Sequence, residues 1–396
     1  MLIRGWASLR GLPRAVWVLC IASFANRVGT MALPYLVLYL TGPRGFTTAQ
    51  AGTVMSVYGA TAFVAGWLSG RLSDRFGPVA VLRVTLIAAA AALCLYPLAH
   101  TFVHVLVATV AWSLCAEGFR PAVLTAMAQS APEPLRKPAY ALMRLSINLG
   151  MSVGPAAGGF LAAVSFPSIF IVDGLTSLVA SLLLIASFPV KRAVGEITAS
   201  SDTPTVDQSS RLQGRSLLIA LSLILAGGFL MACSYFQCEA VLGLHLTRDL
   251  HFPAYALGLV FTLNTLLIVA FEVPLNAATA RWSHRRTLTL GAALMGAGFA
   301  LYAIAFDAWS IACGTIVWTV GEMILFPSVP AFLAAIAPPD KQGRVMALYP
   351  MAWSAAFIVA PLAGLAIYDR AGSAAVWLTV TAACTVAALL YSRLRH

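Results

Sequence analysis

Charged and amide side chains interrupt several long apolar stretches of this sequence, where they could bind a proton or a charged solute. Glu117 and Arg120 are three residues apart near the middle of one stretch, so an α-helix would place both on one face. Asn26 and Arg27 lie in the middle of another stretch, and Glu322 lies in the middle of a third. If these stretches cross a bilayer, each central charge costs about 2.5–3.5 kcal/mol and is expected to have a partner or a function.

A buried carboxylate can load and release a proton when its surroundings change. Burial favours its protonated form, whereas a neighbouring arginine favours its charged form. We therefore predict that Arg27 and Arg120 hold Glu117, with Glu322 as a further candidate, in a network that switches between these two environments. The alternative is a static ion pair that fixes helix packing beside a water-filled cavity.

Other polar residues in the apolar stretches allow more than one interpretation. Glu239, near the outer end of its stretch, could attract cations or simply be hydrated. Glu272 could serve packing or an interhelical bond. Asp173 is expected at the start of a helix, where the helix dipole favours a carboxylate. Arg144 and Asn148 are expected to bond to another helix, and three helices remain open as the partner.

The sequence carries no pattern of a known catalytic or metal site. The motifs GxxxxGK[ST] and HExxH are absent, and the one GxSxG match, residues 150–154, lies inside an apolar stretch rather than at the strand-to-helix turn that a hydrolase needs. The seven cysteines form no CxxC pair and all lie in apolar stretches, so neither a disulfide framework nor a zinc site is predicted. We expect no enzyme activity, no bound metal or cofactor and no ATP-driven pumping by this chain.

The composition points to a helical membrane protein. Of the 396 residues, 60% are hydrophobic and only 10% are charged, against about 25% in an average soluble domain. The apolar stretches are continuous rather than alternating with period two, which favours helices over a transmembrane barrel. The net charge of +11 fits basic cytoplasmic loops and contact with anionic lipid better than it fits nucleic-acid binding.

Twelve apolar stretches are long enough for a bilayer core of about 30 Å, which needs about 20 residues per helix. They lie near residues 16–40, 51–70, 79–99, 103–129, 138–164, 167–189, 216–240, 253–279, 287–305, 308–336, 344–368 and 372–391. The polar stretch 191–215 has the composition of a linker. We predict an all-α membrane protein with two six-helix bundles, residues 1–190 and 216–396, joined by this linker.

The distribution of basic residues predicts the orientation. With the N-terminus inside, twenty Lys and Arg residues fall in cytoplasmic segments and three, Arg44, Arg248 and Arg370, fall in outer loops. Because cytoplasmic loops of membrane proteins are enriched in Lys and Arg, we expect both termini and the linker to be cytoplasmic.

The two halves repeat each other at one offset in the sequence. A shift of 206 residues relates Pro155 to Pro361 and Gly158 to Gly364. The same shift pairs Thr41 with Thr247, Gly52 with Gly258, Arg75 with Arg281, Tyr96 with Tyr302, Trp112 with Trp318 and Pro121 with Pro327. Six-helix repeats that both begin inside are parallel repeats, and these enclose a cavity between the halves near the middle of the bilayer.

A short polar segment between the second and third stretches contains Gly70, Asp74, Arg75 and Gly77. The glycines allow a tight turn and close helix contact. Asp74 could accept hydrogen bonds from a helix N-terminus of the other half, and Arg75 could bridge to a carboxylate or a lipid phosphate. We predict a latch that holds the cytoplasmic side closed when the cavity opens outward; the alternative is a generic polar turn.

The fifth stretch contains a cluster of small residues and a proline, namely Gly150, Gly154, Pro155, Gly158 and Gly159. Small residues let helices pack closely, and a proline bends a helix. The cluster therefore predicts close helix packing.

These features resemble the major facilitator superfamily over essentially the whole chain. The first motif resembles the cytoplasmic-loop signature G-x-L-x-D-R-x-G-R-R, and the second resembles the pattern g-x-x-x-G-P-x-x-G-G of its drug- and metabolite-exporting antiporters. The basic pair of the signature is missing, because Pro78 and Val79 stand there. Leu114 stands where the fourth helix of the exporters usually carries an arginine. The resemblance implies a central cavity lined by the first, fourth, seventh and tenth helices, which carry Asn26, Arg27, Glu117, Arg120, Glu239 and Glu322.

The resemblance also implies the function. We expect a secondary active transporter that works by alternating access and exports a small amphipathic or drug-like solute in exchange for protons, with the proton gradient as its energy source. The runner-up is an importer of a polar or anionic solute such as a sugar, peptide or organic acid, in which Arg27 and Arg120 bind a carboxylate or phosphate. A lipid scramblase or membrane sensor is the third reading. The expected partners are the solute, protons and lipids of a bacterial inner membrane, with no nucleic acid and a monomeric chain.

Overall fold

The computed structural model describes residues 11–132, 135–188, 215–279, 281–338 and 342–394. All regular elements in these ranges are helices. Most of the predicted linker lies outside the described residues, as do Arg4, Arg10, Lys341 and Arg395 of the basic cytoplasmic segments.

The described residues of the first half form seven long helical elements. They are α2 (Arg14–Gly29), α3 (Ala32–Thr41), α4 (Thr48–Phe76), α5 (Pro78–Leu95), α6 (Phe102–Ser130), α7 (Arg136–Val164) and α8 (Phe166–Ser187), with a short 3-10 turn η1 (Tyr96–Leu98) after α5. A capping box starts α4, because the Thr47 side chain accepts from the backbone N–H of Gln50 while the Gln50 side chain accepts from that of Thr47.

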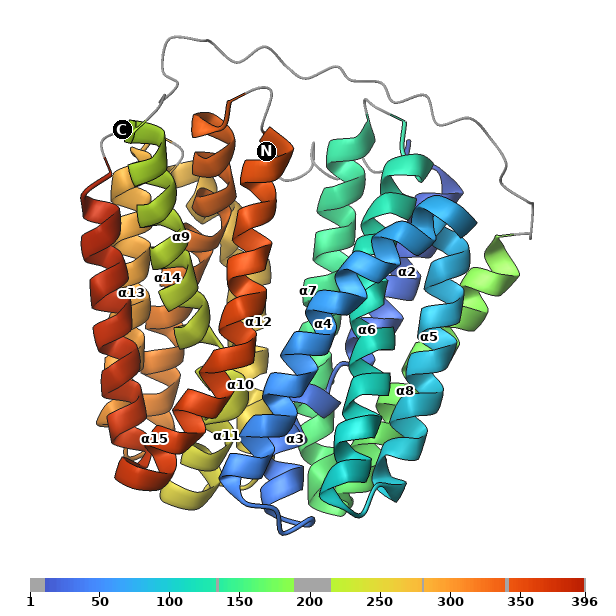
Figure 1. Ribbon diagram of the computed structural model, residues 1–396, viewed down its shortest axis with the longest axis horizontal. Helices are drawn as coiled ribbons and strands as arrows, with labels where there is room; N and C mark the ends of the chain where they lie inside the picture. Colours follow the sequence, from blue (N-terminus) through green and yellow to red (C-terminus); the bar gives the residue numbers. More distant parts are fainter. Residues whose placement is uncertain (1–10, 133–134, 189–214, 280, 339–341, 395–396) are drawn as a thin grey trace.

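The second half repeats this order. Its elements are α9 (Arg215–Tyr235), α10 (Gln237–Ala240), α11 (Leu242–Leu244), the π-helical turn η4 (His245–Asp249), α12 (Tyr255–Thr279), α13 (His284–Ala303), α14 (Ala308–Ile336) and α15 (Gln342–Ser392). The two halves lie side by side and are joined mainly by contacts of α4 with α15 and of α7 with α12 (Figure 1). The end of α8 and the start of α9 lie at one end of the molecule, and α3, α10 and α11 meet at the other.

Ten described segments are long and apolar enough to cross a membrane. One of them, Leu348–Ser392, covers the last two predicted stretches and contains Gly372, whose φ of 77° is in the left-handed region that favours glycine. Gly372 divides α15 into two helices, and Figure 1 shows α15 as two arms that run in opposite directions. The predicted stretch at 287–305 falls on α13, which is not among the ten.

The offset of 206 residues recurs in the hydrogen bonds. The hydroxyl of Tyr96 bonds to Thr109 Oγ1 at 2.8 Å, and that of Tyr302 bonds to Thr315 Oγ1 at 2.7 Å. Both tyrosines are fully buried. Because the same side chains make the same bond in each half, the repeat extends from the sequence to the packing of the buried helices.

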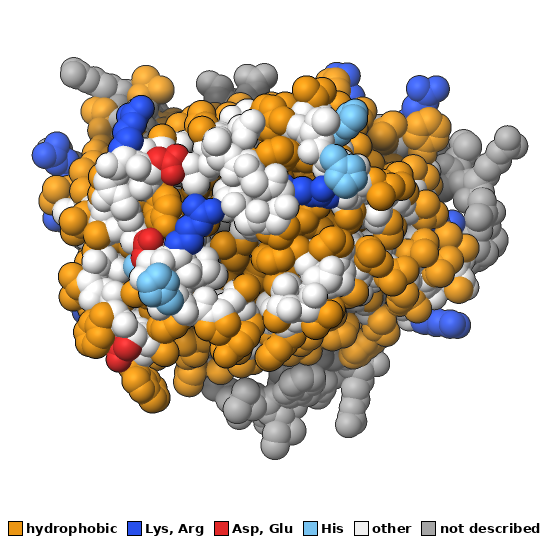
Figure 2. Space-filling model, turned by 90° about the horizontal axis from the view of Figure 1, so that it is seen from below, with side chains coloured by type: hydrophobic (Ala, Val, Ile, Leu, Met, Phe, Trp, Pro, Cys, Tyr) orange, Lys and Arg blue, Asp and Glu red, His pale blue; other side chains and the backbone are white. Residues whose placement is uncertain are grey.

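The halves also touch at the end of the molecule where α3, α10 and α11 meet. The Arg248 guanidinium donates to the backbone oxygen of Thr41 at 3.2 Å, and the Thr48 hydroxyl donates to Asp369. Figure 2, which views this end, shows a few basic and acidic side chains beside backbone and uncharged polar atoms, with hydrophobic side chains over much of the remaining surface. These bonds link the predicted outer sides of the two halves.

The only histidine buried in the described chain, His245, lies at this end, outside the apolar segments. Its Nδ1 is 2.8 Å from Ser373 Oγ and 3.5 Å from Asp249 Oδ2. Burial lowers the pKa of His245 below its ordinary value, and Asp249 opposes this shift only in part. The folded protein therefore prefers the neutral imidazole.

This preference predicts how stability depends on pH. The neutral form of His245 contributes to the free energy of unfolding above about pH 6.5, which is the pKa of an unperturbed histidine. This contribution is lost as the pH falls through the lower pKa that His245 has in the folded protein. Thermal unfolding in detergent should therefore show a smaller loss of stability on acidification for His245→Gln than for the wild type. The exposed His104 provides the matched control, and His104→Gln should behave like the wild type. Parallel pH profiles for wild type and His245→Gln would contradict the expectation.

Candidate functional site

A cavity of about 380 Å³ lies inside the first half. Its walls come from α2 to α8, and among the described residues Glu239 of α10 is the one contribution of the second half. Five predicted site residues line this cavity, namely Asn26, Arg27, Glu117, Arg120 and Glu239. Apolar side chains and the rings of Tyr58 and Trp112 supply most of the remaining surface.

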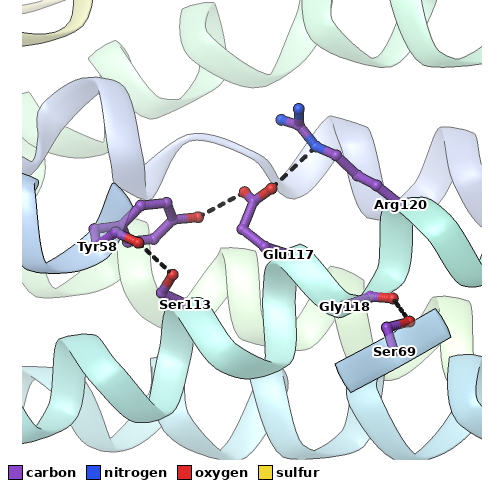
Figure 3. A network of polar contacts seen from close by, with 6 residues as sticks. All are labelled: Tyr58, Ser69, Ser113, Glu117, Gly118 and Arg120. Atoms are coloured by element: carbon purple, nitrogen blue, oxygen red, sulfur yellow. Dashed lines mark hydrogen bonds and ion pairs between the residues drawn. The ribbon is translucent and has the colours of Figure 1, made fainter. Parts of the chain in front are cut away.

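Glu117 is held from two sides (Figure 3). The Tyr58 hydroxyl of α4 donates to Glu117 Oε1 at 2.9 Å, and Arg120 Nε lies 3.2 Å from Glu117 Oε2. Ser113 of α6 donates to the backbone oxygen of Tyr58 at 2.8 Å, which ties α4 to α6 beside the carboxylate. The side chain of Glu117 is 16% exposed and that of Arg120 is 62% exposed, so the arginine is the more open member of the pair.

Arg27 lines the same cavity but does not pair with Glu117. Its Nε is buried without a hydrogen-bond partner among the described residues, and no ion pair to Arg27 is formed there. The neighbouring Asn26 donates from Nδ2 to Ser177 Oγ of α8 at 3.2 Å. Of the two arginines predicted to hold Glu117, only Arg120 contacts it within the described residues, and Tyr58 is the second partner that the structure adds.

Two helix breaks, which the sequence did not predict, lie beside the cavity. The first apolar stretch is divided into α2 and α3 around Thr30, and the seventh is divided into α9 and α10 at Phe236. These positions are again 206 residues apart. Broken helices expose backbone groups near the middle of the membrane, which is typical of transporter binding sites. The sequence signal for the first break is Gly29, which directly precedes it and is a residue that weakens a helix.

Asp173 satisfies the backbone at the first break. It lies well inside α8 rather than at the predicted helix start, and its Oδ2 accepts from the backbone N–H groups of Met31 at 3.4 Å and Ala32 at 3.2 Å. The carboxylate therefore caps α3, a helix that is more than 130 residues away in the sequence. The carboxylate of Asp173 does lie at a helix N-terminus, as predicted, but at that of α3 rather than that of its own helix α8.

Removing this cap should destabilise the protein. Asp173→Ala leaves the buried N–H of Ala32 without its acceptor and that of Met31 with the backbone oxygen of Gly29 alone, and it should cost about 1–2 kcal/mol of unfolding free energy. Asp173→Asn keeps one acceptor oxygen and should cost less. Denaturant unfolding of the purified variants checks the order, and an Asp173→Ala variant as stable as the wild type would show that the break needs no cap.

Glu322 lies outside this cavity, so its predicted place in the network of Arg27 and Arg120 is wrong. It is buried in the second half, where Asn264 of α12 donates from Nδ2 to Glu322 Oε2 at 2.8 Å and contacts Thr319 Oγ1 at 3.0 Å. Asn264 and Thr319 are 206 residues after Tyr58 and Ser113. The two halves thus hold a carboxylate in the same way. In the first half a side chain of α4 bonds to a carboxylate of α6, and in the second half a side chain of α12 bonds to a carboxylate of α14.

An ion pair connects the halves elsewhere. The Arg144 guanidinium of α7 contacts the Glu272 carboxylate of α12. Of the helices left open for Arg144, the structure selects the eighth predicted stretch. The contact explains how both side chains are tolerated in apolar stretches.

The predicted latch is largely helical. Gly70, Asp74 and Arg75 belong to the last turns of α4, and Gly77 follows as its cap with φ of 83°. Asp74 is exposed and has no hydrogen-bond or ion-pair partner within the described ranges, while the Arg75 guanidinium lies 5.1 Å from the Phe76 ring centroid. In this conformation the described chain makes no latch through Asp74.

The small residues of α7 face its neighbours. A Cβ added at Gly150 would lie 2.6 Å from Arg27 Cβ, and one at Gly154 would lie 2.8 Å from the backbone oxygen of Val28. Gly158 is equally close to α3 at Met31. A Cβ added at Gly159 would lie 2.5 Å from the Cα of Tyr255 in α12.

Pro155 takes part in the same packing through its backbone. Its oxygen accepts from the Tyr35 hydroxyl of α3 at 3.0 Å. The cluster in α7 therefore contacts helices of both halves.

The family model described as Major Facilitator Superfamily matches residues 19–244 and 224–396. The protein belongs to this superfamily. It is therefore an integral multi-pass membrane protein of a transporter family, and its bacterial relatives support a place in the bacterial inner membrane.

Two relatives and one solved structure illustrate the similarity. The tetracycline resistance protein, class C, of Escherichia coli is 28% identical over 344 residues, covering 82% of this chain and 81% of the relative. The Na(+), Li(+), K(+)/H(+) antiporter of Planococcus maritimus is 21% identical over 369 residues, covering 86% of each. The crystal structure of the peptide transporter POT in complex with sulfate has a TM-score of 0.80 at 16% identity, covering 96% of this chain and 94% of that one. The last comparison shows a shared fold.

Proposed function

We propose that this superfamily member is a proton-coupled exporter of a small amphipathic organic solute that works by alternating access. The observation that carries the proposal is the cavity in which Glu117 bonds to Tyr58 and Arg120 while Glu239 reaches in from the other half. A cavity of about 380 Å³ with mostly apolar walls and a few converging polar groups is typical of a small-molecule site. The relatives named as a resistance protein and as a proton antiporter favour export in exchange for protons.

In the proposed cycle Glu117 carries the proton. A proton on Glu117 removes its negative charge and weakens the ion pair with Arg120. The freed guanidinium changes the charge that the solute meets, so that proton and solute occupy the cavity in turn. The proton gradient supplies the energy, and no bound cofactor is required.

The proposal includes twelve membrane crossings with both termini in the cytoplasm. It counts α13 as one crossing and the two arms of α15 around Gly372 as two. At the predicted outer side the halves are joined by the bonds of Thr48 and Arg248, and Asp74 has no partner among the described residues. These observations support a conformation that is closed on the outer side, in which the latch is open; the latch would form when the cavity opens outward.

Import of a small anionic or zwitterionic solute is the second candidate. It is favoured by the free guanidinium of Arg27 in the cavity and by the likeness to a peptide transporter fold. A guanidinium binds carboxylates well because it offers several N–H donors in a plane.

Inside-out membrane vesicles distinguish the two directions. Tetracycline and dialanine serve as probes, and the vesicle lumen is made acidic. An exporter that exchanges solute for protons should accumulate tetracycline in these vesicles. Accumulation of dialanine by right-side-out vesicles with an acidic exterior, without tetracycline accumulation in the inside-out ones, would replace export by import.

A further inference from the structure

A second pocket lies at the surface, away from the central cavity. It has a volume of about 520 Å³ and lies where α13 begins, beside the end of α15. Two arginines, Arg285 and Arg286, and the hydroxyls of Ser283, Thr289 and Ser392 line it. No carboxylate is among its described lining residues, and neither arginine forms an ion pair in the described part of the chain.

The positive charge of the pocket has several sources. Both arginines are exposed, and α13 presents its N-terminal N–H groups and the positive end of its dipole here. Ser283 caps the helix by accepting from the backbone N–H of Arg286 at 3.3 Å. The Arg286 guanidinium lies 4.2 Å from the centroid of the Trp282 ring, which holds it near the pocket.

A further observation points to a ligand. The Thr289 side chain lines the pocket, and its Oγ1 is buried without a hydrogen-bond partner among the described residues. A buried hydroxyl without a partner costs free energy, which a bound acceptor would recover. Further along α13, the apolar side chains of Leu290 and Ala293 also line the pocket.

The position suits a membrane interface. The pocket lies at the end of the molecule where α8 ends and α9 begins, which is the predicted cytoplasmic side (Figure 1). Tryptophan and arginine are typical of this depth, where the inner leaflet carries anionic lipids. A free anion would use the arginines but not the apolar surface of Leu290 and Ala293.

We propose that this pocket binds the phosphate headgroup of an anionic phospholipid of the inner leaflet. Arg285 and Arg286 hold the phosphate, Thr289 donates its hydroxyl to a headgroup oxygen, and an acyl chain lies along Leu290 and Ala293. Because α13 and the last arm of α15 form the pocket together, the lipid links these two helices.

Native mass spectrometry of the purified full-length protein tests the proposal. The protein is titrated with phosphatidylglycerol or with phosphatidylcholine of the same acyl chains. The wild type should bind phosphatidylglycerol more tightly. An arginine near the surface contributes about fivefold to the affinity for an anionic lipid, so Arg285→Gln with Arg286→Gln should weaken it roughly 25-fold. Thr289→Val, which keeps the charge and nearly the volume, should weaken it about threefold.

Arg71 provides a matched control. Its guanidinium lies 4.0 Å from the Trp67 ring centroid, so it repeats the stacked arginine of the site without lining the pocket. Arg71→Gln should bind phosphatidylglycerol like the wild type. Size-exclusion chromatography and circular dichroism establish that each variant is folded before it is titrated.

Three results would overturn the proposal. The first is equal affinity of the wild type for the two lipids. The second is an equal loss in Arg71→Gln and in the double variant, which would indicate a diffuse basic surface. The third is displacement of the lipid by millimolar inorganic phosphate, which would make the pocket a site for a free anion.

Discussion

Replacing Glu117 with glutamine is expected to abolish proton-coupled transport without unfolding the protein. Glutamine keeps the shape of the side chain and an acceptor for the Tyr58 hydroxyl, but it cannot carry a proton. The ion pair with Arg120 is lost at the same time. In proteoliposomes with a pH-sensitive dye inside, solute-dependent proton flux should fall by at least 100-fold, whereas exchange of labelled tetracycline without a gradient should persist.

Glu272 is the control for this experiment. It is a carboxylate of similar burial that pairs with Arg144 and does not line the cavity, so Glu272→Gln should retain proton flux. Glu322→Gln tests the second half, where Asn264 holds the carboxylate in the corresponding arrangement. If Glu117→Gln transports protons like the wild type, Glu117 is a static partner of Arg120 and the proposed coupling is wrong.

Adding one methyl group at Gly258 is expected to stop transport. Gly258 lies at the start of α12, and a Cβ there would overlap the backbone oxygen of Pro155 and lie 2.8 Å from Ala156 Cα. Both neighbours belong to the backbone of α7, so they cannot rotate away. Gly258→Ala should therefore separate α7 from α12, force the halves apart at the end where α3, α10 and α11 meet, and lower the transport rate at least tenfold.

The separation can be measured directly. Spin labels at residues 49 and 370, which are exposed on the two sides of the Thr48–Asp369 contact, should report a longer distance in Gly258→Ala than in the wild type. Gly66, a helical glycine of α4 with nothing within 4 Å of an added Cβ, is the matched control. Gly66→Ala should transport normally and gain up to about 1 kcal/mol of stability from the better helix propensity of alanine. An unchanged label distance in Gly258→Ala would mean that α7 and α12 adapt.

The sequence by itself determined the class of fold and the local geometry of the main site. Hydrophobicity and periodicity are local properties, so the apolar stretches predicted where helices lie to within a few residues. The spacing of Glu117 and Arg120 fixed their common helix face, and the structure shows them in contact. The offset of 206 residues predicted equivalent halves, and the paired bonds of Tyr96 and Tyr302 agree with it.

The partners of the other charged residues were decided only by the tertiary structure. Asp173 caps α3, Arg144 pairs with Glu272, and Glu322 bonds to Asn264, each across a contact between helices distant in the sequence. Which side chains meet depends on the rotation and depth of both helices, and these follow from packing at positions such as Gly150 and Gly258. The breaks beside Thr30 and Phe236 have the same origin, because a broken helix is tolerated in a membrane only where neighbouring groups satisfy its free backbone. Those neighbours are brought there by the fold.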